Sequence, residues 1–195
     1  MCAKRPRPTA IFIDDIAVIT DEHWCDAGRQ LLEAVSERPA VTCVPVEHHA
    51  RRAASRDAGL RIVSYSWIRP TSGAGPSTVE PLPTGSDLTE PPPHTFGGRL
   101  DPWHDGALSF VAAGSGIVTG SRSVNAPPVY DPGGTVATID RLIGDRPALV
   151  RTALACAGRR GDVLACVVCA DGDDNLAVVL ERARFQRVVE VWTWG

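Results

Sequence analysis

The segment HWCDAG, residues 23–28, has the position of a phosphate-binding loop and part of the required composition. It lies between a strand-like run, AIFIDDIAVI, and a helix-like run, RQLLEAV. A loop at such a junction can bind phosphate through backbone N–H groups, and it usually needs several glycines because side chains block close approach. Here Gly28 is the only glycine, and the Asp26 carboxylate would repel a diphosphate. The segment therefore indicates either a degraded phosphate loop, with the Gly28 amide still usable at the helix start, or an ordinary turn.

Three other groups of side chains could bind a ligand or react, but each also has a purely structural interpretation. Cys166 and Cys169 have CxxC spacing but lie in a strand-like run, where residues three apart point to opposite faces, so redox or metal chemistry is disfavoured. The segment ADGDDN, residues 170–175, resembles part of a calcium loop without its distal Glu, so a turn with a helix N-cap is favoured. A basic run at 48–56 opens a predicted helix. We interpret it as a solvated face, with contact to a nucleotide phosphate as the alternative.

Two similar series of elements must position these motifs. Residues 9–68 and 135–194 each predict strand, loop, helix, strand, helix and strand, in that order. The matched pairs are Thr9 with Thr135, Ile13 with Ile139, Asp14 with Asp140, Cys43 with Cys166, and Trp67 with Trp192. Strands that alternate with helices indicate an α/β sheet with parallel pairing. A true internal repeat is the favoured interpretation, and chance similarity between two α/β segments is the alternative.

A proline-rich stretch separates the two series. Residues 70–102 hold eight of the sixteen prolines and show no sustained helical or strand period. We therefore predict an N-terminal half-lobe at 1–69, a linker at 70–102 and a C-terminal lobe at 103–195. Only eight residues of this sequence precede the first strand, at 9–19, so that strand would be an open edge. We expect the 107–139 region or a second copy of the chain, hence a homodimer, to cover it.

Composition restricts the classes of partner. The chain has 195 residues, is 44% hydrophobic and carries a net charge of −3, which gives no general reason to expect a nucleic-acid partner. No apolar run approaches the length of a membrane span, so no membrane partner is expected. Six cysteines are too few and too scattered for a disulfide scaffold of this size. These features predict a soluble cytoplasmic protein, and the composition suggests a bacterial genome.

Each series resembles the second half of a GNAT-type N-acetyltransferase. In that superfamily a strand is followed by a pyrophosphate loop of the form Arg/Gln-x-x-Gly-x-Gly/Ala, a long helix, a strand, a short helix ending in Gly-Phe and a final strand. The run IDDIAVITDEHWCDAGRQLLEAV matches the first part, and RDAGLRIVSYSW and VLERARFQRVVEVW match the closing part in the two copies. GALSFVAAGSGIVTGSRSV, residues 106–124, resembles the two strands that come before. The resemblance implies an α/β fold with mixed, centrally parallel sheets, flanking helices and tandem GNAT-like lobes.

The resemblance also assigns cofactor-binding residues. In the first copy they are Val18, His23, Ala27, Gly28 and Arg29. In the second copy the loop aligns as RPALVR, where Leu149 and Arg151 occupy the glycine positions. Arg146 and Arg151 are expected to neutralise phosphate through their side chains instead.

The catalytic candidates that the resemblance assigns are carboxylates on the first strand of each copy. They are Asp14 and Asp15 in the first copy and Asp140 in the second. Asp14 and Asp15 cannot both face the acyl group, because successive strand residues point to opposite faces. A local capping or pairing role is the competing interpretation for each. The superfamily's frequent acid, a Tyr, aligns with Ser55 and Leu180, which cannot replace it.

The function implied is transfer of an acetyl or related acyl group from a CoA thioester to a small-molecule amine. Acetyl-CoA or another acyl-CoA is the expected cosubstrate. The alternative is a non-catalytic GNAT-like binding or assembly protein that has kept the scaffold and lost the cofactor. The missing glycines and the missing Tyr favour that alternative, whereas Asp14 and Gly28 favour the enzyme.

Overall fold

The computed structural model describes residues 11–13, 20–34, 40–71, 79–81, 110–112, 114–123 and 132–194 of the chain. The chain divides into two compact units: unit 1 comprises Met1–Val63 and Val189–Gly195, and unit 2 comprises Ser64–Val188. The chain leaves unit 1 within strand β3 (Arg61–Pro70) and returns within strand β9 (Gln186–Thr193). These units are interleaved along the sequence. The consecutive division at 1–69, 70–102 and 103–195 stays a prediction.

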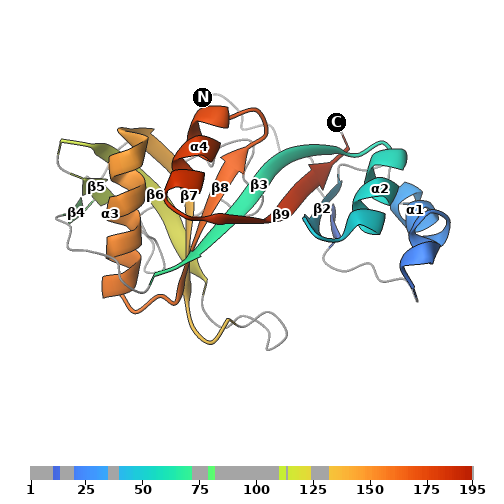
Figure 1. Ribbon diagram of the computed structural model, residues 1–195, viewed down its shortest axis with the longest axis horizontal. Helices are drawn as coiled ribbons and strands as arrows, with labels where there is room; N and C mark the ends of the chain where they lie inside the picture. The colour runs from blue at the N-terminus through green and yellow to red at the C-terminus, as the bar shows by residue number, and fades with distance from the viewer. Residues whose placement is uncertain are drawn as a thin grey trace, which may run out of the picture. The chain divides into compact units, whose positions relative to one another are not determined.

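Unit 2 contains a mixed sheet in the order β3-β8-β7-β6-β5-β4 (Figure 1). Its further strands are β4 (Glu80–Pro81), β5 (Phe110–Ala112), β6 (Gly116–Ser123), β7 (Val136–Gly144) and β8 (Leu164–Ala170). The β7–β8 pair is parallel, and the other pairs described are antiparallel. The predicted mixed α/β fold is confirmed, and the two strands expected within 106–124 are β5 and β6. Strand β4 lies inside the stretch that was expected to be a linker.

Two helices cover one face of this sheet, as Figure 1 shows. Helix α3 (Arg146–Arg159) follows β7, and helix α4 (Asp174–Arg182) follows β8. Each begins at an aspartate that caps it: an Asp145 side-chain oxygen accepts from the Ala148 N–H at 3.2 Å, and Asp173 accepts from the Leu176 N–H at 3.1 Å. The N-cap predicted for ADGDDN is therefore confirmed. The helices and the sheet share one core: Leu149 and Leu154 of α3 and Leu180 of α4 cluster with Ile139 of β7 and Val167 of β8.

Apart from an added 3-10 helix, the elements of unit 1 follow the order of β7, α3, β8 and α4 in unit 2. Its elements are β1 (Ile11–Ile13), the 3-10 helix η1 (Asp21–Trp24), α1 (Ala27–Glu33), β2 (Ala40–Pro45) and α2 (His49–Asp57). Strands β1 and β2 are parallel, and β2 pairs antiparallel with β9. The core of unit 1 contains Trp24, Leu32, Val44, Leu60 and Trp192.

The last strand of each sequence half completes the unit formed by the other half. Strand β3 ends the first predicted copy, yet it pairs with β8, where Trp67 lies opposite Val167. Strand β9 ends the second copy, yet it pairs with β2, where Trp192 lies opposite Thr42. Each matched tryptophan therefore lies on a strand that runs antiparallel to the second strand of the other sequence half. The order of elements agrees with the predicted repeat, while the repeat itself stays a prediction.

Candidate functional site

Asp140 is the extra residue of a β-bulge in strand β7. Thr119 of β6 pairs with Arg141 and the next residue, Gly120, pairs with Ile139, so the ladder passes over Asp140. The Thr119 hydroxyl donates a hydrogen bond of 2.6 Å to the Asp140 carboxylate, which is partly buried. Bulges redirect a side chain and occur often beside active sites. The carboxylate assigned to catalysis in the second copy therefore lies at an irregular point of the sheet, and its orientation is fixed by Thr119.

The parallel strands β7 and β8 stop pairing beside this bulge. Their ladder ends where Ile139 lies opposite Val167, although β7 continues to Gly144 and β8 to Ala170. Beyond that point the facing backbone groups of the two strands do not bond to each other in the part of unit 2 that the structure describes. Strand edges of this kind can accept an extended chain that carries amide groups. Asp140 is the first β7 residue past the end of the ladder, so this opening starts at the candidate base.

A pocket of about 220 Å³ lies between the two helices that follow these strands. It is lined by Pro147 and Arg151 of α3 and by Val179, Arg182 and Ala183 at the end of α4. Arg151 and Arg182 are exposed, and neither has an ion pair or a hydrogen bond to any residue that the structure describes. Two unpaired guanidinium groups on apolar walls make the pocket attractive to an anion.

Arg146, the other arginine assigned to phosphate binding in the second copy, has a partner. Its guanidinium donates to the Asp173 carboxylate at 2.7 Å and so links the start of α3 to the N-cap of α4. The structure therefore separates the two predicted phosphate ligands. Arg146 joins two helix starts, whereas Arg151 shares a pocket with Arg182, a residue that was not among the candidates. In the sequence, Arg182 is marked only by its helical spacing from Val178 and Val179. That spacing predicts a helix, and it does not predict that Arg182 lines a pocket.

The CxxC cysteines behave as the strand pattern predicts. Cys169 faces the core and is 1% exposed, whereas the alternation of burial along β8 places Cys166 on the other face. Both are free thiols. Burial raises the pKa of Cys166 to about 11, against a smaller lowering by a hydrogen bond with Ser66. Burial, together with the nearby Asp173 carboxylate, raises the pKa of Cys169 to about 11 as well. Both thiols are therefore protonated near neutral pH and are poor nucleophiles.

The equivalent helix start in unit 1 is filled by its own side chains. Gly28 is buried under the Trp24 indole, and a β-carbon on Gly28 would lie 2.3 Å from Cε3 of Trp24. The packing of Trp24 therefore explains why residue 28 is a glycine, without any phosphate. The Asp26 side chain makes no capping hydrogen bond to α1.

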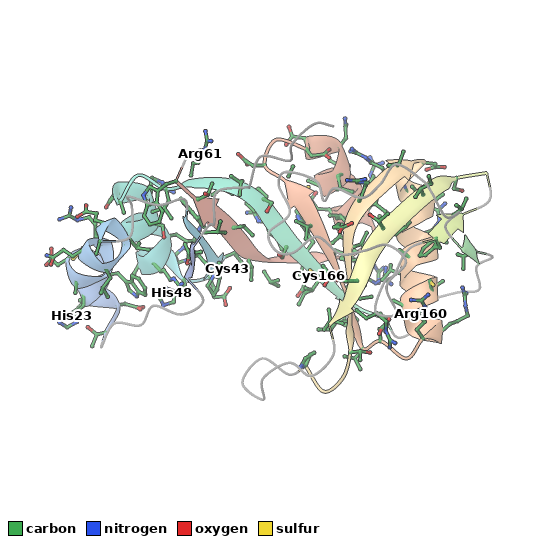
Figure 2. The ribbon with its side chains drawn as sticks, turned by 180° about the vertical axis from the view of Figure 1, so that it is seen from behind. His23, Cys43, His48, Arg61, Arg160 and Cys166 are labelled. Atoms are coloured by element: carbon green, nitrogen blue, oxygen red, sulfur yellow. The ribbon has the colours of Figure 1, made fainter. Side chains whose placement is uncertain are left out.

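The other first-copy candidates make local contacts or are not described. Arg29 donates to the Glu33 carboxylate at 2.7 Å, one turn along α1. His23 Nδ1 lies 2.8 Å from the Thr20 hydroxyl oxygen, and Ala27 is the exposed first residue of α1 (Figure 2 labels His23). The remaining candidates, Asp14, Asp15 and Val18, lie outside the described residues.

The interpretation of the basic run as a solvated face is wrong at Arg51 and at Arg52. Arg51 is only 9% exposed, its guanidinium lies 5.4 Å from the centre of the Trp24 ring, and it donates to the Thr42 hydroxyl at 3.1 Å. Arg52 donates to Glu190 at 2.9 Å, and Glu190 is 1% exposed. Both guanidiniums therefore have internal partners in unit 1.

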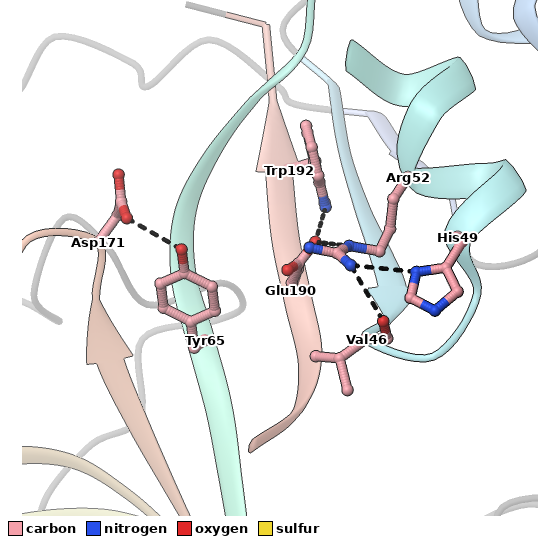
Figure 3. Close-up of polar contacts among 7 residues, drawn as sticks. All are labelled: Val46, His49, Arg52, Tyr65, Asp171, Glu190 and Trp192. Atoms are coloured by element: carbon pink, nitrogen blue, oxygen red, sulfur yellow. Dashed lines mark hydrogen bonds and ion pairs between the residues drawn. The ribbon is translucent and has the colours of Figure 1, made fainter. Parts of the chain in front are cut away.

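Figure 3 shows how the Arg52–Glu190 pair is completed. The Trp192 indole N–H donates to the same Glu190 oxygen at 3.1 Å, and Arg52 also donates to the Val46 carbonyl at 3.3 Å. The buried carboxylate thus accepts from two donors, one of them charged. Because Glu190 and Trp192 belong to β9, this cluster fastens the last strand of the sequence into unit 1.

Tyr65 also lies in a unit that its position in the sequence does not indicate. It belongs to β3, and its partner across the ladder is Cys169 of β8, so its phenol is part of unit 2. The hydroxyl donates to Asp171 at 3.1 Å (Figure 3). The Arg187 guanidinium lies 4.7 Å from the centre of the ring. The resemblance does not identify Tyr65, because the superfamily's Tyr position aligns with Ser55 and Leu180.

The described residues contain neither a candidate metal site nor a helix that could span a membrane. No group of three or more His, Cys, Asp and Glu side chains among them could hold a metal ion. No helix in the described ranges is both long enough and apolar enough to cross a membrane.

Comparison with known proteins gives similarity to solved structures alone. No protein-family model matches the chain, and no curated protein sequence does. A GCN5-related N-acetyltransferase from Sphaerobacter thermophilus is similar over 80% of this chain and 59% of its own, with 14% identity and a TM-score of 0.47. A GCN5-related N-acetyltransferase from Anabaena variabilis is similar over 87% of this chain and 49% of its own, with 13% identity and a TM-score of 0.40. The chain thus spans about half to three fifths of the length of these two proteins.

Proposed function

We propose that unit 2 binds an acyl-CoA and transfers its acyl group to a small amine. The observation that carries this proposal is the end of the β7–β8 ladder beside the bulged Asp140. The pantetheine arm of CoA is an extended chain with two amide groups, and such a chain can bond to strand edges as an added strand does. Its thioester end would then lie near a carboxylate.

Asp140 is the residue we assign as general base. As the amine nitrogen bonds to the thioester carbonyl carbon, the Asp140 carboxylate accepts the proton that the nitrogen loses. The carbon–sulfur bond then breaks, and the electron pair leaves with sulfur. The thiolate takes up a proton from water to give the free thiol of CoA, and Asp140 returns its proton to the solvent. The Thr119 hydroxyl, 2.6 Å from the carboxylate, orients it for this role.

Phosphate binding in this proposal relies on side chains. The start of α3 lacks the glycines of a phosphate loop, so a cradle of backbone N–H groups is not supported. The two unpaired guanidiniums of Arg151 and Arg182 supply positive charge beside the same helix. Unit 2 would therefore bind the same cosubstrate with different chemistry from the loop that the resemblance implies.

For unit 1 we propose the non-catalytic alternative. Its helix start is occupied by Trp24, and Arg51 and Arg52 are used in internal contacts. In this view the chain is a tandem of two related units, in which unit 2 holds the substrate and unit 1 has become a structural partner.

Asp140→Asn tests the proposal, with Asp57→Asn in unit 1 as the matched control. The wild-type chain should bind acetyl-CoA in calorimetry and acetylate members of a panel of small amines. Asp140→Asn should lower turnover by about a hundredfold or more and leave acetyl-CoA affinity unchanged, because a general base acts on the chemical step. Asp57→Asn should change neither. Failure of the wild-type chain to bind acetyl-CoA, or binding with no turnover across the panel, would instead support a non-catalytic protein.

A further inference from the structure

We propose that the pocket between α3 and α4 is a subsite for the 3′-phosphate of CoA, which makes unit 2 selective for CoA over dephospho-CoA. This inference rests on the proposed function and adds a specificity to it. The residues that would hold the phosphate are Arg151 of α3 and Arg182 of α4, which both line the pocket.

The first argument is the free positive charge of the pocket. Most described arginines of unit 2 have partners within the protein. Arg122, for example, forms an ion pair with Asp162, and Arg146 forms one with Asp173. Among the described residues of unit 2, the arginines without a bonded partner or a ring contact are Arg151, Arg182 and Arg184. Two of these three line one pocket. Guanidinium groups that have no partner among the described residues and that line one pocket from two helices provide a site for an anion.

The second argument is the charge and geometry of the ligand group. A phosphate monoester carries about −1.5 to −2 charges at pH 7 and presents three acceptor oxygens. Each guanidinium can bind two oxygens of such a group, so Arg151 and Arg182 together match a monoester better than a singly charged carboxylate. The 3′-phosphate is the monoester of CoA, whereas its diphosphate is a diester with one charge on each phosphorus.

The third argument is the shape of the pocket. Its volume of about 220 Å³ is below the range of about 300–1,000 Å³ that encloses a whole small ligand, so it suits one part of a larger molecule. Pro147, Val179 and Ala183 give it apolar walls beside the cations. A phosphate attached to the sugar of a nucleoside could place its charge on the arginines and its sugar edge on those walls.

A fourth observation removes an electrostatic obstacle. The end of a helix carries partial negative charge on its unbonded carbonyls, which would repel an anion at the end of α4. The Arg69 guanidinium donates to the Ala183 carbonyl at 2.6 Å and so occupies an oxygen at this end of the pocket. Because Arg69 bonds to this carbonyl, the positive charges of Arg182 and Arg151 remain available to the ligand.

The pocket is also well placed along the chain. Helix α3 begins two residues after β7 ends, and Pro147 and Arg151 belong to its first two turns. An acyl-CoA whose thioester lies at Asp140 would pass this part of α3 on leaving the open ends of β7 and β8. Its adenosine end is the part that would reach the helices.

The test compares CoA with dephospho-CoA by calorimetry, in the wild-type chain and in two charge variants. The wild-type chain should bind CoA at least about tenfold more tightly, as expected for charge-assisted hydrogen bonds to one phosphate. Arg182→Glu should remove this preference and leave dephospho-CoA affinity within about twofold. Arg184→Glu makes the same change in charge at an arginine that does not line the pocket, and it should keep the preference.

The outcomes separate this inference from the function on which it rests. Equal affinity for CoA and dephospho-CoA in the wild-type chain would overturn the subsite while leaving acyl-CoA binding in place. A preference that survives Arg182→Glu, or that Arg184→Glu removes equally, would also overturn it. Failure to bind either compound would contradict the proposed function, and the subsite with it.

Discussion

Units 1 and 2 differ most at the start of the helix that follows their first strand. In unit 1 the Trp24 ring covers Gly28, and the arginines of the next helix are turned to internal partners. In unit 2 the corresponding helix, α3, borders a pocket with two arginines that have no bonded partner among the described residues. The same order of elements thus supports two uses of basic side chains. A guanidinium bonded inside the protein stabilises the fold, whereas one without a partner is available to a ligand.

Removing the cation of the buried pair should have the largest effect on stability. Arg52→Met leaves the Glu190 carboxylate 1% exposed without its charged partner. We expect the free energy of unfolding in urea to fall by about 3 kcal/mol, the lower end for breaking a buried pair, because Arg52 is partly exposed. Acetyl-CoA affinity under native conditions should stay the same.

Arg56→Met is the matched control, since Arg56 is exposed on the same helix and has no ion pair with any described residue. The double variant Arg52→Met/Glu190→Gln should recover much of the lost stability, because an uncharged amide still accepts from the Trp192 indole. A loss in Arg52→Met no larger than that of Arg56→Met would show that the pair does not fasten β9 into unit 1.

Adding one carbon to Gly28 should have a smaller effect and should separate two explanations of this glycine. Gly28→Ala places a β-carbon 2.3 Å from the Trp24 ring, and overpacking of this kind costs about 1–3 kcal/mol. If packing is the reason for the glycine, stability in urea falls while acetyl-CoA affinity does not change. Ala27→Ser, at the exposed neighbouring position, is the control. Weaker acetyl-CoA binding at unchanged stability would instead restore the phosphate-loop interpretation.

The sequence predicted the features that depend on neighbouring residues. The hairpin within 106–124, the cap at Asp173 and the opposite faces of Cys166 and Cys169 all follow from patterns a few residues long. The pairing of β3 with β8 and of β9 with β2 does not follow from such local patterns. Alternation along a strand shows which face is buried, and it does not show which strand lies beside it. The residue pattern of the last strand of a repeat is the same whether that strand pairs within its own half or with the other half.

The site could be predicted only in part for the same reason. Asp140 was a candidate, but the bulge that singles it out depends on register with Thr119, which no single strand encodes. Arg52 looked solvated because its partner, Glu190, is 138 residues away in the sequence. The glycine at position 28 correctly indicated that another group lies close to the backbone there, and that group is the Trp24 ring.

Amide hydrogen exchange with and without acetyl-CoA tests most directly that unit 2 holds the ligand and unit 1 does not. We predict slower exchange on binding at 140–151 and 168–183, where β7 and β8 part and where α3 and α4 line the pocket. Residues 20–34, around Trp24 and Gly28, should exchange at the same rate in both samples. Protection of 20–34, or no protection within 140–151 and 168–183 at saturating acetyl-CoA, would contradict the assignment of the site to unit 2.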